Sequence, residues 1–312
     1  MPAATRNPAP PDWAAVVDAA QTAGWTAAVV DAARLDDVRG RVAGVLASGE
    51  LPGRTVGHLA GETAFAWPDA IPRPRSVVVA ATPRPLTRAM LTSPAGPREV
   101  LVPPHYAGYH TVPDGLAAVV DAALAPAGYR AARFEPPLKT LAACAGLARY
   151  GRNNIAYVAG LGSYLMLAAC ASDAPPPGDA SWGEPETLAR CERCSACMRA
   201  CPSGAIRADR FLLETDRCLT GANESADPFP AWVDPAWHHA AVGCLRCQQA
   251  CPENAGVDLR ISEPEPFDEA ETATILAAGG DLAPATAEKL ARCGLDYAPA
   301  LIARNLGALL GL

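Results

Sequence analysis

The feature that most constrains this chain is a run of cysteines with the spacing found in iron–sulfur proteins. The run begins at Cys191, ends at Cys201 and is followed by Pro202, with the spacing C-x2-C-x2-C-x3-C-P. In bacterial ferredoxins this run binds a [4Fe–4S] cluster, and in two-cluster ferredoxins its fourth cysteine binds the other cluster. The run therefore predicts two clusters and a second set of cysteines elsewhere in the chain.

A second run, from Cys244 to Cys251, supplies the last three cysteines of the same pattern and is also followed by proline. Ala241 stands where the first cysteine of a full run would be, and Cys218 lies upstream as its replacement. We predict that one cluster, cluster A, is bound by Cys191, Cys194, Cys197 and Cys251. The other, cluster B, is predicted to be bound by Cys201, Cys218, Cys244 and Cys247.

Zinc is the alternative metal, because paired C-x2-C units also form zinc sites. Four cysteines in one run, with the terminal Cys-Pro repeated, fit two cubane clusters better. The remaining cysteines are Cys144, Cys170 and Cys293, which we expect to be small buried thiols.

Charge and hydropathy narrow the class of protein. The net charge is −7 with no run of Lys or Arg, so the sequence lacks the basic footprint of a nucleic-acid-binding protein. Neither an apolar leader nor an uninterrupted apolar span is evident, so we expect a cytoplasmic protein without a membrane segment. A reducing compartment makes metal binding the expected use of eleven cysteines.

Hydrophobic periodicity predicts an α/β domain over residues 1–173, because helices alternate there with short apolar strands. The expected helices cover residues 12–20, 35–46, 113–124 and 138–149, and the expected strands cover 76–82, 129–134, 155–159 and 164–170. Residues 86–101 look irregular, with strand character only at 100–102.

Composition then divides the rest of the chain. A linker rich in proline covers 174–185 and precedes a cluster domain at 188–262. Residues 263–312 form a C-terminal helical tail, with an acidic passage followed by short helices at 285–293 and 297–310.

Two segments outside the cysteine runs give the chain a family resemblance. The segment from Gly146 to Asn154 contains Gly-Arg-Asn-Asn, and the segment beginning at Gly162 reads Gly-Ser-Tyr. With the two cysteine runs in this order, they resemble the epoxyqueuosine reductase family, which is related to the corrinoid reductive dehalogenases. The resemblance covers about residues 75–310. It implies a nitroreductase-like α/β module that binds base-off cobalamin, followed by a ferredoxin-like α+β domain with two [4Fe–4S] clusters.

The resemblance also implies site residues. The expected cobalamin-binding residues are Tyr106, His110, Tyr150, Asn153, Asn154, Gly162, Ser163 and Tyr164. The candidates for proton donation or cofactor contact at the catalytic centre are Tyr109, Glu135 and Arg152. Each has a structural alternative: Glu135 could favour the start of a helix, Arg152 could belong to a turn, and the tyrosines could pack in a loop or core.

Two departures from the family pattern shape the functional prediction. The family's catalytic aspartate aligns with Ala132, and its C-terminal tRNA-binding repeat has no counterpart before Leu312. With the acidic balance, these departures make tRNA an unlikely partner.

We therefore predict a cytoplasmic corrinoid-dependent reductase, related to but distinct from epoxyqueuosine reductase. Its two clusters would pass electrons from an external donor of the ferredoxin or flavodoxin type to cobalamin, for reduction of a small organic substrate. The alternative is a ferredoxin-type electron-transfer protein that reduces a partner protein or its corrinoid.

Overall fold

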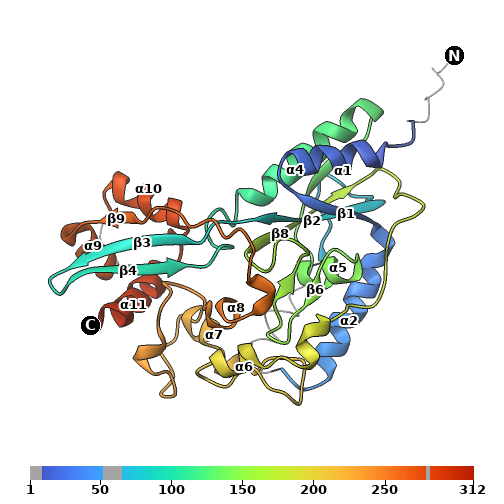
Figure 1. The fold of residues 1–312 in the computed structure, drawn as a ribbon. Helices are drawn as coiled ribbons and strands as arrows, with labels where there is room; N and C mark the ends of the chain where they lie inside the picture. The colour runs from blue at the N-terminus through green and yellow to red at the C-terminus, as the bar shows by residue number, and fades with distance from the viewer. Residues whose placement is uncertain (1–8, 52–64, 279–281) are drawn as a thin grey trace. The chain divides into compact units, whose positions relative to one another are not determined.

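The computed structural model describes residues 9–51, 65–278 and 282–312 (Figure 1). The chain forms two compact units that are not continuous in sequence. Unit 1 contains residues up to 83, 110–150 and 167–187, and unit 2 contains 84–109, 151–166 and 188–312. The domain boundaries predicted from composition follow chain order and stay a prediction. Within the described residues, no helix combines the length and apolarity needed to cross a bilayer.

Unit 1 is built on a four-stranded sheet in the order β1-β2-β8-β5. These strands are β1 (Thr26–Asp31), β2 (Ser76–Pro83), β5 (Ala131–Phe134) and β8 (Leu165–Ser172). The pairs β1–β2 and β5–β8 are antiparallel, with Val29 opposite Val78. Since successive side chains of a strand point to opposite faces, the buried run of β2 needs helices on both sides of the sheet.

The helices of unit 1 supply that cover. They are α1 (Trp13–Thr22), α2 (Leu35–Ala47), α4 (Val112–Leu124) and α5 (Leu138–Cys144), with short 3-10 turns at Ala32–Arg34 and Ala125–Ala127. Helices α1 and α4 share a core with Val78 and Ala80 of β2. Figure 1 shows α2 and α5 on the opposite side of the sheet. The predicted α/β class is thus confirmed for this part of the chain.

Unit 2 contains a second sheet, of order β4-β3-β9, formed by β3 (Thr87–Ser93), β4 (Gly96–Val102) and β9 (Glu265–Phe267). Strands β3 and β4 are an antiparallel hairpin, whereas β9 pairs in parallel with β3. The prediction of an irregular 86–101 segment is therefore wrong. Ala89 and Leu91 of β3 alternate as buried residues, as in other half-buried strands. The third strand of the sheet, β9, comes from the far end of the chain, so the local sequence does not reveal it.

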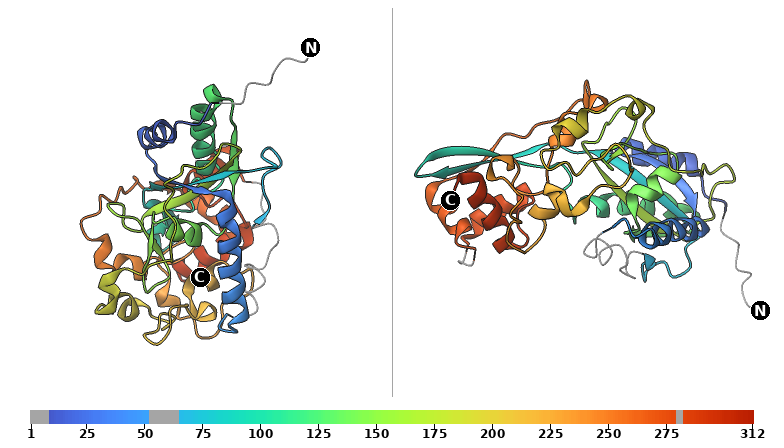
Figure 2. Two further views of the ribbon diagram at one scale, coloured as in Figure 1. Left: turned by 90° about the vertical axis from the view of Figure 1, so that its right-hand side faces the viewer. Right: turned by 90° about the horizontal axis from the view of Figure 1, so that it is seen from below.

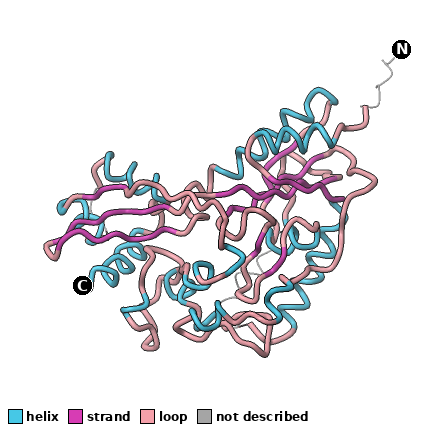
Figure 3. The backbone as a smooth tube through the Cα atoms, viewed as in Figure 1, coloured by secondary structure: helices cyan, strands magenta, loops and turns pink. Residues whose placement is uncertain are grey.

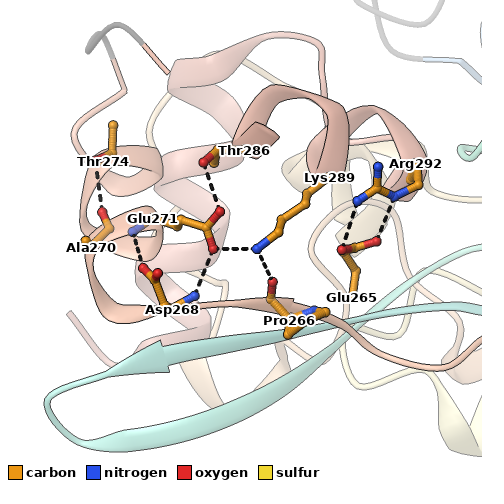
Figure 4. Close-up of polar contacts among 9 residues, drawn as sticks. All are labelled: Glu265, Pro266, Asp268, Ala270, Glu271, Thr274, Thr286, Lys289 and Arg292. Atoms are coloured by element: carbon orange, nitrogen blue, oxygen red, sulfur yellow. Dashed lines mark hydrogen bonds and ion pairs between the residues drawn. The ribbon is translucent and has the colours of Figure 1, made fainter. Parts of the chain in front are cut away.

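Three C-terminal helices pack on this sheet: α9 (Glu269–Leu276), α10 (Pro284–Cys293) and α11 (Pro299–Leu310). The right-hand view of Figure 2 shows them alongside the β3–β4 hairpin. Helices α10 and α11 were predicted, but α9 was not, because its acidic sequence resembles a linker. Its start is fixed by a capping box between Asp268 and Glu271 (Figure 4).

Between β4 and β9 the second unit has little regular structure, as the loops in Figure 3 show. Its α-helices there are α6 (Ala196–Ala200), α7 (Leu219–Asn223) and α8 (Arg246–Gln249). The 3-10 turns are Ala189–Glu192, Thr215–Arg217, Pro235–Trp237 and Pro252–Asn254. The two-residue strand β6 (Arg149–Tyr150) belongs to unit 1, whereas the two-residue strand β7 (Ala156–Tyr157) belongs to unit 2. This loop-rich region carries the cysteine runs.

Candidate iron–sulfur centre

Each cysteine run wraps around a helix of a single turn. In the first run, α6 begins after Ser195 and stops at Cys201, where Pro202 prevents continuation because proline has no backbone N–H. The second run repeats this arrangement around α8, and Cys251 leads directly into the turn Pro252–Asn254. The repeated Cys-Pro therefore ends each helix and turns the last cysteine away from its own run.

The structure gathers the predicted ligands of cluster A around one hollow. Four cysteines line this hollow: Cys191, Cys194, Cys197 and Cys251. Burial raises the pKa of the Cys197 thiol, and the negative charges of Cys191, Cys251 and Cys194 raise it further. Cys251 thus lies with the first run, as the ferredoxin pattern predicts.

The predicted ligands of cluster B form a second group. Burial raises the pKa of Cys244 to about 11, and the nearby Cys218 and Cys201 add to that effect. Burial also raises the pKa of Cys247, where the charges of Cys244, Cys218 and Cys201 contribute as well. Because these thiols raise one another's pKa, they lie together and bind as thiolates only when a metal compensates the charge.

In the described parts of the chain, no three His, Cys, Asp or Glu side chains converge closely enough to hold one metal ion. The four predicted ligands of cluster A surround one hollow, as the ligands of a cubane cluster do. The assignment of each ligand stays a prediction, and this grouping supports it.

The Gly-Arg-Asn-Asn loop lies directly against the cluster A ligands. The backbone N–H of Arg152 donates a hydrogen bond to Cys191 Sγ at 3.4 Å, and its guanidinium donates to the Cys191 carbonyl at 2.6 Å. Asn154 adopts a left-handed conformation with φ of 60°, and its amide donates to the Phe211 carbonyl. Arg152, a candidate catalytic residue, therefore contacts the protein chain around cluster A.

Close packing explains why this loop begins with glycine. A Cβ at Gly151 would lie 2.4 Å from Asn153 Oδ1 and 2.6 Å from Tyr157 Cε2. The amide of Asn153 in turn donates to the Tyr157 hydroxyl at 2.9 Å. Tyr157 has no distinguishing sequence signal, and sequence reasoning missed it.

The Gly-Ser-Tyr segment packs against the turn that follows Cys251. Ser163 N–H donates to Asn254 Oδ1 at 2.8 Å, and Ser163 Oγ bonds to Gln248 Oε1 at 2.9 Å. A Cβ at Gly162, where φ is +60°, would lie 2.4 Å from Asn254 Oδ1. Tyr164 is buried with Leu86 and Leu245.

Tyr106 belongs to a polar pair near Cys218, a predicted ligand of cluster B. Its hydroxyl donates to Glu224, and its ring stacks with Tyr297. Burial raises the pKa of Tyr106, and burial also raises the pKa of Glu224. The two residues are far apart in sequence, so only the folded chain brings Glu224 to Tyr106.

The other predicted site residues have the following local contacts. Glu135 is exposed and forms an ion pair with Arg133, whose guanidinium also donates to the His110 carbonyl at 2.6 Å. Tyr150 shares a hydrogen bond with Thr140 at 3.2 Å. Tyr109 is 55% exposed. The catalytic and cobalamin-binding roles given to these residues stay predictions.

Comparison with known proteins agrees with this site. Residues 190–254 match the family model described as a 4Fe-4S double cluster binding domain. Fold and site thus define an iron–sulfur protein with a double-cluster domain. Within that class the chain is similar to epoxyqueuosine reductases, as its motifs predicted. The protein of that name from Pseudomonas aeruginosa is 32% identical over 142 residues, covering 45% of this chain and 38% of the relative. The one from Escherichia coli is 30% identical over 126 residues, covering 40% and 32%.

Solved structures agree at the level of the fold. A selenomethionine-labelled epoxyqueuosine reductase matches with a TM-score of 0.69 and 20% identity, covering 96% of this chain and 80% of that one. An epoxyqueuosine reductase with a modified tRNA stem loop matches with a TM-score of 0.65 and 18% identity, over the same shares. The sequence match itself spans less than half of these curated relatives. The predicted enzyme class, an iron–sulfur reductase, agrees with their names.

These relatives correct two predictions. The prediction of a corrinoid-dependent reductase for a small organic substrate is wrong, and so is its electron-carrier alternative, because the relatives are epoxyqueuosine reductases. The exclusion of tRNA is also wrong, since a protein of this fold was solved with a tRNA stem loop. Net charge is a poor guide to RNA binding because it sums over the whole chain, whereas RNA meets only a local surface.

Proposed function

We propose that the protein is a cytoplasmic iron–sulfur reductase of the epoxyqueuosine type, acting on an epoxide-bearing nucleoside in tRNA. The observation that carries the proposal is the division of eight cysteines into two groups, with Cys251 lining the hollow formed by the first run. This arrangement lies in a chain whose sequence relatives and structural neighbours are epoxyqueuosine reductases.

The chemistry requires a supply of single electrons. Reduction of an epoxide to an alkene consumes two electrons and two protons and releases one water molecule. When bound, the two [4Fe–4S] clusters supply those electrons one at a time from an external reductant. The cysteine thiolates would hold the clusters. The two protons require donors, for which Glu135 and Tyr109 stay the predicted candidates.

The architecture of unit 1 also enters the proposal. Its sheet, covered by helices on both faces, supports the nitroreductase-like assignment that the resemblance implied.

Cobalamin fits less well with the described residues. The side chain of Asn153 and the backbone N–H of Ser163, both expected to hold a corrin, instead donate to Tyr157 and to Asn254. We derive no step through a corrin, and its binding stays a prediction of the resemblance.

The test is a single-turnover assay on protein reconstituted anaerobically with iron and sulfide. Dithionite serves as reductant and a tRNA stem loop bearing epoxyqueuosine as substrate, in parallel reactions with and without added cobalamin. We expect mass spectrometry to show loss of one oxygen atom from the nucleoside. Comparison of the two reactions tests the cofactor prediction.

The control is Cys251→Ala, which removes a predicted cluster A ligand and should abolish the conversion. A protein that retains both clusters but leaves the nucleoside unchanged in both reactions would contradict the proposal.

A further inference from the structure

We propose that Asn153 and Tyr157 form a hydrogen-bonded bridge between the ligands of the two clusters and thereby set the clusters' reduction potentials. They act as positioning residues, through the cysteine sulfurs. The inference rests on the two-cluster part of the proposed function and is independent of the substrate.

The bridge begins with a hydrogen bond that is fully enclosed by protein. Asn153 Nδ2 donates to Tyr157 Oη at 2.9 Å, and the two residues are only 2% and 3% exposed. The other end of the amide, Asn153 Oδ1, accepts a longer bond from Ile155 N–H at 3.4 Å. Gly151 packs so closely against both side chains that no larger residue fits there. The pair is therefore held in one arrangement.

Each side chain of the pair also reaches a cysteine sulfur. The Tyr157 hydroxyl lies beside Cys251, and the Asn153 side chain lies beside Cys247, so each polar group is placed to donate to a cysteine sulfur. An asparagine amide has two N–H donors, so one can serve Tyr157 and the other Cys247. Cys251 lines the hollow of cluster A, whereas Cys247 groups with the ligands of cluster B. The bridge thus runs from a ligand of one cluster to a ligand of the other.

The backbone of the same loop adds a third sulfur contact, since Arg152 N–H donates to Cys191 at 3.4 Å. Residues 151–157 therefore supply hydrogen-bond donors to ligands of both clusters. A buried asparagine can satisfy its hydrogen bonds with partners of any kind. Simple packing therefore does not explain why one short segment directs several donors at cysteine sulfurs.

The physical consequence follows from the charge of a reduced cluster. Reduction adds negative charge, part of which resides on the cysteine sulfurs. A donor aimed at such a sulfur stabilises the reduced form more than the oxidised form and raises the potential. Tyr157 should therefore raise the potential of cluster A. Asn153 should raise that of cluster B directly, and that of cluster A through the orientation of Tyr157.

The experiment is an EPR-monitored redox titration of the reconstituted protein without substrate. In Tyr157→Phe only the hydroxyl is lost, and we expect one midpoint potential to become more negative while the other stays at the wild-type value. In Asn153→Leu, which is close to asparagine in shape, has no N–H donor and adds no charge, we expect both potentials to become more negative. Iron content is measured on the same samples.

A matched control is Tyr164→Phe. Tyr164 is also a buried tyrosine near these cysteines, but its hydroxyl bonds to Asn254 rather than to sulfur. Its removal should leave both midpoint potentials unchanged. Wild-type potentials in Tyr157→Phe, or an equal shift in Tyr164→Phe, would overturn the inference.

A second variant keeps the test decisive if Tyr157→Phe fails to hold its clusters. Incorporation of 3-fluorotyrosine at position 157 retains the ring and makes the hydroxyl a stronger donor. The potential of cluster A should then move to a more positive value, opposite to the phenylalanine variant. No shift, or a negative one, would overturn the inference. Because no tRNA is present, this outcome is separate from success or failure of the nucleoside assay.

Discussion

At the scale of single residues, Cys218 is the ligand whose role is least evident from spacing, because it belongs to neither cysteine run. It precedes α7, and its charge affects both Cys244 and Cys247. We predict that Cys218→Ala loses cluster B, so that iron content falls from about eight to about four atoms per chain. Iron and sulfide analysis of the reconstituted protein provides the measurement.

The control for that variant is Cys293→Ala. Cys293 is a buried thiol at the end of α10, in the core formed with the second sheet. Its removal should leave the iron content unchanged and lower stability only slightly. If Cys218→Ala keeps two full clusters, Cys218 is not a ligand of cluster B.

At the scale of elements, α9 and α10 are joined by a polar network centred on Glu271. Its carboxylate closes the capping box of α9 and accepts hydrogen bonds from Lys289 at 2.7 Å and Thr286 at 3.0 Å (Figure 4). The hydrogen bond from Lys289 is the largest of the effects that hold the pKa of Glu271 below its ordinary value.

This lowered pKa makes the stability of the helix pair depend on pH. A carboxylate whose pKa is lower in the folded state stabilises it above the unfolded pKa, and that contribution is lost as pH falls through the folded pKa. We predict that Glu271→Gln destabilises α9 and α10 by a constant amount between pH 7 and pH 5. The difference from wild type should begin to shrink below about pH 4.3, where the unfolded chain takes up a proton at this position, and it should be lost as pH falls through the lower pKa of folded Glu271.

Hydrogen exchange of α9 and α10 peptides, measured from pH 7 to 3.5, tests this prediction. Glu265 also contributes to the pH dependence of stability in this region, because its ion pair with Arg292 lowers the pKa of Glu265. Comparison of wild type with Glu271→Gln cancels that shared effect. A difference that does not change with pH would show that the network is stabilised by packing rather than by charge.

At the scale of the whole molecule, the two units differ in what holds them together. Unit 1 has a sheet covered by helices, whereas the cysteine region of unit 2 relies on helices of four or five residues. Isolated helices this short are unstable in water. Metal binding must therefore contribute much of the folding energy of that region.

We predict that removal of iron by a chelator makes residues 188–254 sensitive to trypsin while the sheet of unit 1 stays protected. The expected cleavage sites are Arg193, Arg199, Arg207, Arg210 and Arg217. Limited proteolysis with mass spectrometry compares apo and reconstituted protein at equal protease ratios. Equal resistance of the two forms would show that the region folds without its clusters.

The sequence by itself determined the features that depend on local spacing. The cysteine runs, the helices α1, α2, α10 and α11 and the buried strand β2 all follow from residue type and periodicity. The family resemblance also followed from short contiguous motifs. The physical reason is the same in each case, because neighbours in the chain decide these properties.

Only the tertiary structure decided which distant residues meet. The hairpin β3–β4 gains its third strand from β9, and Asn153 finds Tyr157 and Cys247 only when the loops fold around the cysteines. The net charge likewise failed to exclude tRNA, because summing charges along a chain discards their positions. Contacts between segments far apart in sequence depend on packing, which no local pattern records.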